Sequence, residues 1–178
     1  MQIVTLELLK QHCRTDGDDD ELLAIYGNAA ESAVMRAANR NFYLTTADMD
    51  VAVAGIEEAL AEAYRKHDLA VEAAGAIQSW SRRGAAIDRA DTILRRATLS
   101  QDMILHGLVL DLPANWQEES VATLSGAGFD VVAAILLTAG HLYRNRENVV
   151  AGQGSAAVQV PQTAAMLIEP LRWIGPTE

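Results

Sequence analysis

The chain has 178 residues, half of them hydrophobic, and a formal net charge of −10 from 24 acidic and 14 basic residues. No cluster of Lys and Arg dominates, so sequence-specific DNA binding is not expected, because it needs such clusters to displace phosphate counterions. Aromatic residues are only 5% of the chain and alanine is abundant, which favours closely packed helices over a β-sandwich. This length suits one domain, or one domain with a large insertion.

The sequence shows neither a signal peptide nor a membrane span, which predicts a soluble protein that is not exported. Residues 1–10 lack a basic region followed by a long apolar run, so they do not resemble a signal peptide. The longest apolar stretch, 131–139, is far shorter than the roughly 20 residues that a membrane span needs. Cys13 is the only cysteine, which excludes an intrachain disulfide and agrees with a reducing cytoplasm.

The first 45 residues predict two helices separated by an acidic turn. Thr5 is a good N-cap for a short helix over residues 6–14. The turn that follows is rich in carboxylates, and Asp18 or Asp19 is expected to cap the second helix. That helix should run from Asp20 to residue 39 or 40, because apolar residues recur there at steps of three and four.

Residues 46–100 predict a long helical hairpin inserted into the domain. Thr45 or Thr46 would cap a helix that extends to about Trp80, and a second helix should cover residues 85–100. Arg83-Gly84 is the expected bend between two antiparallel helices. One interrupted helix is the alternative, and no heptad repeat is long enough to indicate a coiled coil.

The next part of the chain predicts a connecting segment and then the strongest helix. Residues 101–128 are expected to form a loop or a short strand segment, since they are apolar only from 104 to 112 and then become polar and glycine-containing. The helix from Phe129 to about Arg146 has a wide apolar face, and Gly140 would let a neighbouring helix approach closely.

The chain ends with a small-residue linker at 148–160 and a short helix at 162–168, whose extension Pro170 limits. The predicted fold class is therefore all-α: a small helical bundle with an inserted long helical hairpin and a flexible C-terminal arm.

No group of residues has the spacing of a catalytic, metal or cofactor site. His12 and Cys13 are adjacent and would point roughly 100° apart on a helix, whereas metal ligands converge. The acidic run at 16–21 lacks the glycine and the glutamate of a calcium loop at the required positions. The two Gly-x-Gly sequences, at 126–128 and 152–154, do not continue into a dinucleotide-binding motif. We therefore expect no enzyme activity, no metal and no cofactor.

Basic residues concentrate only in the predicted hairpin, at positions Arg82, Arg83, Arg89, Arg95 and Arg96. We expect these side chains to pair with carboxylates of the same hairpin, namely Glu72, Asp88 and Asp91. Contact with DNA or with another protein is the alternative interpretation.

Three motifs occur in a fixed order in the terminal parts of the chain. The first is the run at 3–10, followed by the acidic turn and an alanine-rich helix. The second is the segment 133–147, an apolar run that leads into His141, Tyr143 and Asn145-Arg146-Glu147. The third is the ending 167–172, Leu-Ile-Glu-Pro-Leu-Arg. Together they resemble the siphophage head–tail connector family, also described as head-completion or adaptor proteins, over about the first 45 and the last 50 residues.

This resemblance implies a structural virion protein and not an enzyme. Residues 1–45 and 129–178 would form the connector helical core, and the hairpin would be an insertion that short family members lack. Subunits of this family form a ring, commonly twelvefold, below the portal protein. The ring extends the DNA channel and offers a platform for a tail-proximal stopper or tail completion protein. Genomic DNA would pass without sequence-specific binding, and no membrane would be involved.

The location implied by the resemblance is the neck of the virion, after a period in the host cytoplasm during assembly. Contacts between subunits, or within the core, are expected from residues at a helix C-terminus: Tyr143, Arg144, Arg146 and Glu147. Docking to the portal is expected from residues of an exposed tail that becomes ordered on binding: Leu171, Arg172, Trp173 and Ile174.

Two other functions remain open at this point. An acidic helical regulatory or scaffold-binding protein would share the alanine-rich hairpin and the negative charge. An enzyme with a dispersed site would depend on histidines for which we find no assignment: His12, His67, His106 and His141.

Overall fold

The structure is a computed structural model that describes residues 3–15, 19–113, 116, 126–145 and 160–175. It confirms the all-α fold class: the described residues are mostly helical, and their only strands are two of two residues each. The chain divides into two compact units. We call Met1–Thr45 with Leu108–Glu178 the core unit, and Thr46–Gly107 the hairpin unit.

The core unit begins with the two helices that the sequence predicts, α1 (Leu6–Cys13) and α2 (Asp20–Ala38). Thr5 caps α1 as expected, because its hydroxyl accepts a hydrogen bond from the backbone N–H of Leu8. Asp19 occupies the N-cap position of α2, but its side chain makes no capping hydrogen bond. The expected position of Asp19 is thus confirmed but its capping hydrogen bond is not, and the other candidate, Asp18, lies outside the described residues. The Asp19 carboxylate accepts a hydrogen bond from the Tyr143 hydroxyl.

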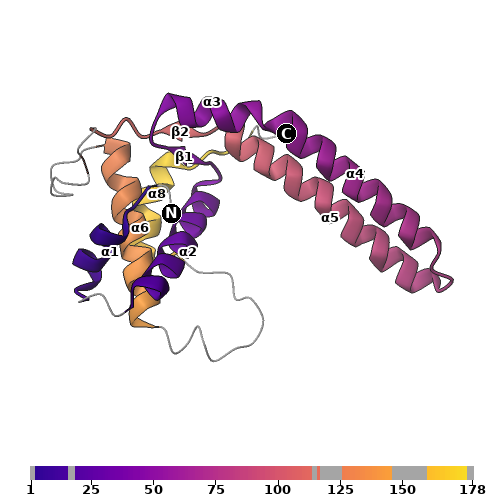
Figure 1. Ribbon diagram of the computed structural model, residues 1–178, viewed down its shortest axis with the longest axis horizontal. Coiled ribbons are helices and arrows are strands. Elements are labelled where there is room, and N and C mark those ends of the chain that lie inside the picture. The colour runs from indigo at the N-terminus through magenta and orange to yellow at the C-terminus, as the bar shows by residue number, and fades with distance from the viewer. Residues whose placement is uncertain (1–2, 16–18, 114–115, 117–125, 146–159, 176–178) are drawn as a thin grey trace. The chain divides into compact units, whose positions relative to one another are not determined.

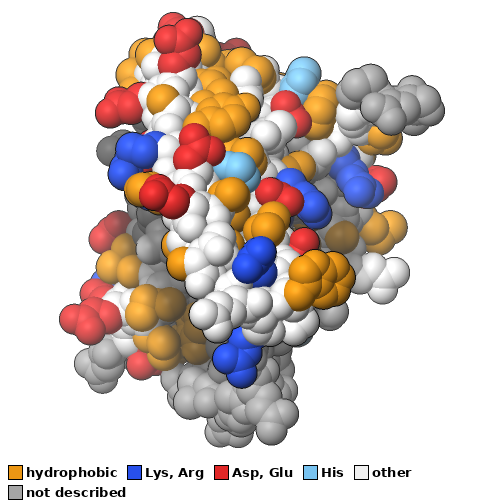
Figure 2. Space-filling model, turned by 90° about the vertical axis from the view of Figure 1, so that its right-hand side faces the viewer, with side chains coloured by type: hydrophobic (Ala, Val, Ile, Leu, Met, Phe, Trp, Pro, Cys, Tyr) orange, Lys and Arg blue, Asp and Glu red, His pale blue; other side chains and the backbone are white. Residues whose placement is uncertain are grey.

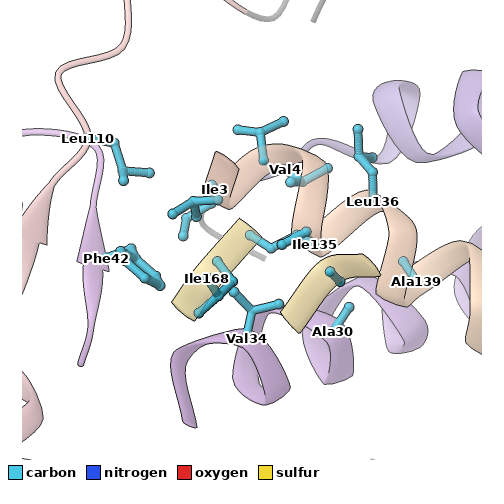
Figure 3. Packing of buried hydrophobic residues seen from close by; sticks show 14 of the residues in the cluster. Ile3, Val4, Ala30, Val34, Phe42, Leu110, Ile135, Leu136, Ala139 and Ile168 are labelled. Atoms are coloured by element: carbon cyan, nitrogen blue, oxygen red, sulfur yellow. The ribbon is translucent and has the colours of Figure 1, made fainter. Parts of the chain in front are cut away.

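Helix α6 (Gly126–Arg144) is the centre of the core unit and packs against α1, α2 and α8 (Gln162–Ile168) (Figures 1 and 3). Its buried face includes Val131, Val132 and Ile135, each with no exposed surface. Burying one such side chain stabilises the fold by roughly 1.5–3 kcal/mol. The helix starts at Gly126, three residues before the predicted Phe129, and it ends at Arg144.

Two very short strands of the core unit flank the hairpin in sequence, one just before it and one just after it. Strand β1 (Phe42–Tyr43) pairs in parallel with β2 (Leu108–Val109). The backbone N–H of Leu108 donates to the carbonyl of Asn41, and that of Leu110 donates to the carbonyl of Tyr43, both at 2.9 Å. The predicted strand segment between 104 and 112 is thus present, but only two residues long.

The C-terminal residues that the structure describes pack on the core unit. Helix α8 buries Ala164 and Ile168, and a 3-10 turn, η2 (Glu169–Leu171), follows it at Pro170. The predicted linker at 148–160 lies outside the described residues, except for Val160.

The hairpin unit contains α3 (Thr46–Ala54), α4 (Ile56–Gly75) and α5 (Trp80–Leu105), and α4 lies alongside α5 (Figure 1). The expected hairpin is confirmed, but its boundaries differ from the prediction. The first helix is interrupted at Gly55, and α5 continues through residues 101–105, which were expected to form a loop or strand. With 26 residues, α5 is about 39 Å long.

The bend of the hairpin lies at residues 76–79 and not at Arg83-Gly84, which α5 contains. The Arg83 guanidinium donates two hydrogen bonds, of 2.9 and 2.7 Å, to the carbonyl of Ile77 and so fastens the bend to α5. A glycine inside an exposed helix costs only about 1 kcal/mol relative to alanine, so Gly84 does not end α5.

The seam between α4 and α5 contains part of the apolar stripe that the sequence predicts for the first helix of the hairpin, including Ile56 and Leu60. Three buried and three half-buried positions of α4 recur at steps of four and three: Ile56, Leu60, Ala63, His67, Ala70 and Ala74. Glu62 and Val71, which flank this row, are half-buried as well. Three of the six residues in the row are alanines, which let the two helices approach closely. This seam fixes which sides of α4 and α5 face outward.

Candidate assembly surfaces

The C-terminal end of α6 is fastened to the start of α2. The Tyr143 hydroxyl donates a hydrogen bond of 2.7 Å to the Asp19 carboxylate, 124 residues away in sequence. Lys10 of α1 forms an ion pair of 2.7 Å with Asp20 in the same region. Tyr143, which the sequence singled out for subunit or core contacts, therefore takes part in the core.

Arg144 is exposed beside the end of α1. Partial burial, and secondarily the positive charge of Arg144, lower the pKa of His12. Burial raises the pKa of the Cys13 thiol, while Arg144 opposes this shift. Neither group thus resembles an activated acid, base or nucleophile.

Gly140 allows α1 to lie close to α6, as the sequence predicts. A Cβ atom at this position would lie 3.0 Å from Nε2 of His12. Arg146 and Glu147, the other two candidates at this helix end, lie outside the described residues.

Part of the segment that was expected to dock on the portal packs within the core unit instead. Leu171 packs against the core, and the backbone N–H of Trp173 donates to the carbonyl of Ala38 at 2.9 Å. Asn39 donates from its side-chain amide to the carbonyl of Trp173 at 3.4 Å. The description of Leu171 and Trp173 as exposed tail residues is therefore wrong, because the end of α2 holds them. Arg172 and Ile174 are exposed, the latter at 75%.

The hairpin unit carries charged groups on its surface. Glu62 pairs with Arg65 at 2.7 Å and with Lys66 at 3.3 Å, and these hydrogen bonds lower the pKa of Glu62 to about 2. Two hydrogen bonds between Glu62 and Arg65 raise the pKa of Arg65.

The expected pairing of hairpin arginines with Glu72, Asp88 and Asp91 is not present among the described residues. Arg83 binds the Ile77 carbonyl, and Asp91 contacts His67 instead. Hydrogen bonding to Asp68, followed by that to Asp91, raises the pKa of His67.

Most of the large hydrophobic side chains that are exposed in the described residues belong to the hairpin unit. Figure 2 shows hydrophobic, acidic and basic side chains intermixed on the surface that it views. Trp80 is 86% exposed and Tyr64 is 57% exposed. The sequence analysis did not single out Trp80, because its position beside the bend was not recognised.

No group of three or more His, Cys, Asp or Glu side chains is placed to hold a metal ion in the described part of the chain. Helix α6 has the length and composition of a membrane span, but 56% of its apolar window is buried inside the protein, as expected of a core helix. Comparison of the chain with family models, curated proteins and solved structures gave no match.

Proposed function

We propose that this chain is a head–tail connector subunit of a tailed bacteriophage. Its copies form a ring, commonly of twelve in the family that it resembles, below the portal protein. The ring extends the DNA channel and provides the attachment platform for a tail-proximal protein. It works by assembly and not by catalysis.

One observation carries the proposal: the segments with the three motifs belong to a single unit although 62 intervening residues, 46–107, form another. The motif-bearing helices α1, α2, α6 and α8 contact one another within that unit. A connector core interrupted by an insertion would have this organisation. Fold and function are separate matters, so the assignment still depends on the motifs.

The polar end of α6 supports two distinct roles within the proposed ring. Tyr143 binds Asp19 of its own chain and would hold the subunit in shape. Arg144 is exposed and is available to a neighbouring subunit. A ring needs two different surfaces per subunit, one for each neighbour, and Arg144 would belong to one of them.

The net charge of −10 suits a channel through which DNA slides. Negative groups repel the phosphate backbone, so the duplex would pass without being gripped.

The test is to mix the purified full-length chain with portal rings and examine the particles by electron microscopy. We expect an added ring of density below the portal, and the same protein should be required for tail attachment in phage particles. Arg144→Glu should weaken ring formation, whereas Arg36→Glu, a matched reversal of an exposed arginine in the last turn of α2, should not. A chain that ignores the portal, in particles that retain DNA and acquire tails without it, contradicts the proposal.

A further inference from the structure

The hairpin has a face on which carboxylates gather. His67 contacts Asp68 of α4 at 3.0 Å and Asp91 of α5 at 3.3 Å, so these two groups lie on the same side of the hairpin. Eleven residues make about three turns of an α-helix, so residues eleven apart lie in one row. Glu57 precedes Asp68 by eleven residues, and Asp102 follows Asp91 by eleven. We call the side that carries these four carboxylates the acidic face; it also carries one exposed arginine, Arg95, seven residues before Asp102.

The opposite side of α5 is basic. Successive residues of an α-helix are about 100° apart, so residues two positions apart point in nearly opposite directions. Arg89 precedes Asp91 by two residues and therefore lies opposite the acidic face. Arg82 and Arg96, each seven residues from Arg89, continue its row. All three arginines are exposed, and within the described part of the chain none forms an ion pair. We call this side the basic face; on α4 it carries Lys66, which pairs with Glu62 one turn earlier.

Near the bend, the acidic face carries an exposed aromatic side chain and the basic face carries a hollow. Trp80 lies eleven residues before Asp91, so its exposed indole projects from the acidic face. Beside the basic row is an open hollow of about 440 Å³, lined by Ile77, Ser81, Arg82, Ala85, Ala86 and Arg89. Small side chains leave room for an aromatic ring, and guanidinium groups stack favourably on such a ring.

We propose that hairpins of neighbouring copies stack face to face, with Trp80 of one copy in the hollow between Arg82 and Arg89 of the next. The proposal rests on the proposed ring, in which each subunit uses two different surfaces for its two neighbours. The occupant is a second copy because the acidic face repels its own kind and attracts the basic face. A tryptophan between arginines also has the composition of an interface hot spot.

A first experiment changes each half of the contact separately in the full-length chain. Trp80→Ala removes the inserted ring, and Ala85→Phe fills the hollow while leaving the charges in place. Each should weaken association between subunits by roughly tenfold or more, as expected for a hot-spot residue. Leu99→Ala is the control, because Leu99 is 58% exposed and lies about a quarter turn from either face. It should change association little.

A second experiment locates the contact by cross-linking in a Cys13→Ser background. Gly84 lies seven residues before Asp91, on the acidic face, and a Cβ there would meet nothing within 4 Å. Ala73 lies seven residues after Lys66, which is opposite Asp68 and hence on the other face. The chain carrying both Gly84→Cys and Ala73→Cys is treated with a thiol cross-linker that spans about 10 Å, one helix diameter.

Stacking of unlike faces predicts a ladder of cross-linked species beyond the dimer from the double variant, and no cross-linked dimer from either single variant. The reaction is carried out on chain bound to portal rings and repeated at high salt, which should reduce the ladder. Dimers from a single variant would show contact between like faces and would overturn the proposal. Portal-bound rings that form normally with Trp80→Ala and give no ladder would overturn the stacking and leave the connector function intact. A chain that never joins the portal would overturn both.

Discussion

Glu31 is a charged side chain that the core unit keeps buried for a structural purpose. It is 5% exposed, and one carboxylate oxygen accepts hydrogen bonds from the backbone N–H groups of Ile3 and Val4, both at 3.0 Å. It thereby holds the N-terminal segment against α2, where Ile3 and Val4 join the core (Figure 3).

Replacing Glu31 by alanine should therefore destabilise the core unit. Each buried N–H group left without a partner costs roughly 1–3 kcal/mol, so we expect the free energy of unfolding to fall by about 2–4 kcal/mol. Glu31→Gln keeps an acceptor oxygen and should cost less. Urea denaturation measures both, with Glu21→Ala, an exposed position of the same helix, as the control. Equal losses for Glu31→Ala and Glu21→Ala would contradict this role.

Two histidines should titrate on opposite sides of the ordinary value of 6.5. Burial lowers the pKa of His12, and hydrogen bonds to Asp68 and Asp91 raise that of His67. The stability that His12 contributes is present above pH 6.5 and is lost as the pH falls through its lowered pKa. The contribution of His67 is present below pH 6.5 and is lost as the pH rises through its raised pKa.

NMR titration of the imidazole protons would test this order. Asp68→Asn should move the pKa of His67 back toward 6.5 and leave that of His12 unchanged. A His67 pKa that does not respond to this change would contradict the assigned cause.

At the scale of single elements, two glycines within helices should respond to alanine in opposite ways. Gly84 of α5 has open space around it, so Gly84→Ala should stabilise the hairpin unit by up to about 1 kcal/mol. At Gly140 the new Cβ would lie 3.0 Å from Nε2 of His12, so the imidazole ring must move and the gain should vanish. Gly140→Leu should cost roughly 1–3 kcal/mol by overpacking.

Thermal unfolding followed by circular dichroism compares these variants directly. An increase in melting temperature for Gly140→Leu, or a large decrease for Gly84→Ala, would show that the packing at these glycines differs from that described.

The helices with dense apolar faces could be predicted from the sequence, whereas the details of the hairpin could not. Apolar residues that recur at steps of three and four in α2 and α6 separate a buried side from an exposed one. In α4 and α5 alanine occurs on both sides, so periodicity marks the seam less clearly than it marks the buried sides of α2 and α6. The bend at 76–79 contains no glycine or proline, and Gly84, which suggested a bend, lies inside a helix. The partner of Tyr143 was beyond prediction for another reason: Asp19 is 124 residues away.

At the scale of the whole molecule, the division into units means that the core unit should fold without the hairpin. The first segment of the core unit ends at Thr45, and the second begins at Leu108. These two ends lie close together because β1 and β2 pair there, with Tyr43 opposite Val109. A short Gly-Ser linker in place of residues 46–107 should therefore preserve the core, whose buried cluster contains no residue of the hairpin.

This excision separates the two proposed modes of assembly. Since the motifs that suggest the connector lie in the core unit, the shortened chain should still unfold cooperatively and still bind portal rings. It should lose the contacts between neighbours that depend on Trp80, so its rings should dissociate at lower salt than those of the full-length chain. Urea denaturation and native mass spectrometry measure these properties. A shortened chain that folds and forms rings as stable as the full-length ones would show that the hairpin serves some other partner, whereas an unfolded one would show that the core depends on the hairpin.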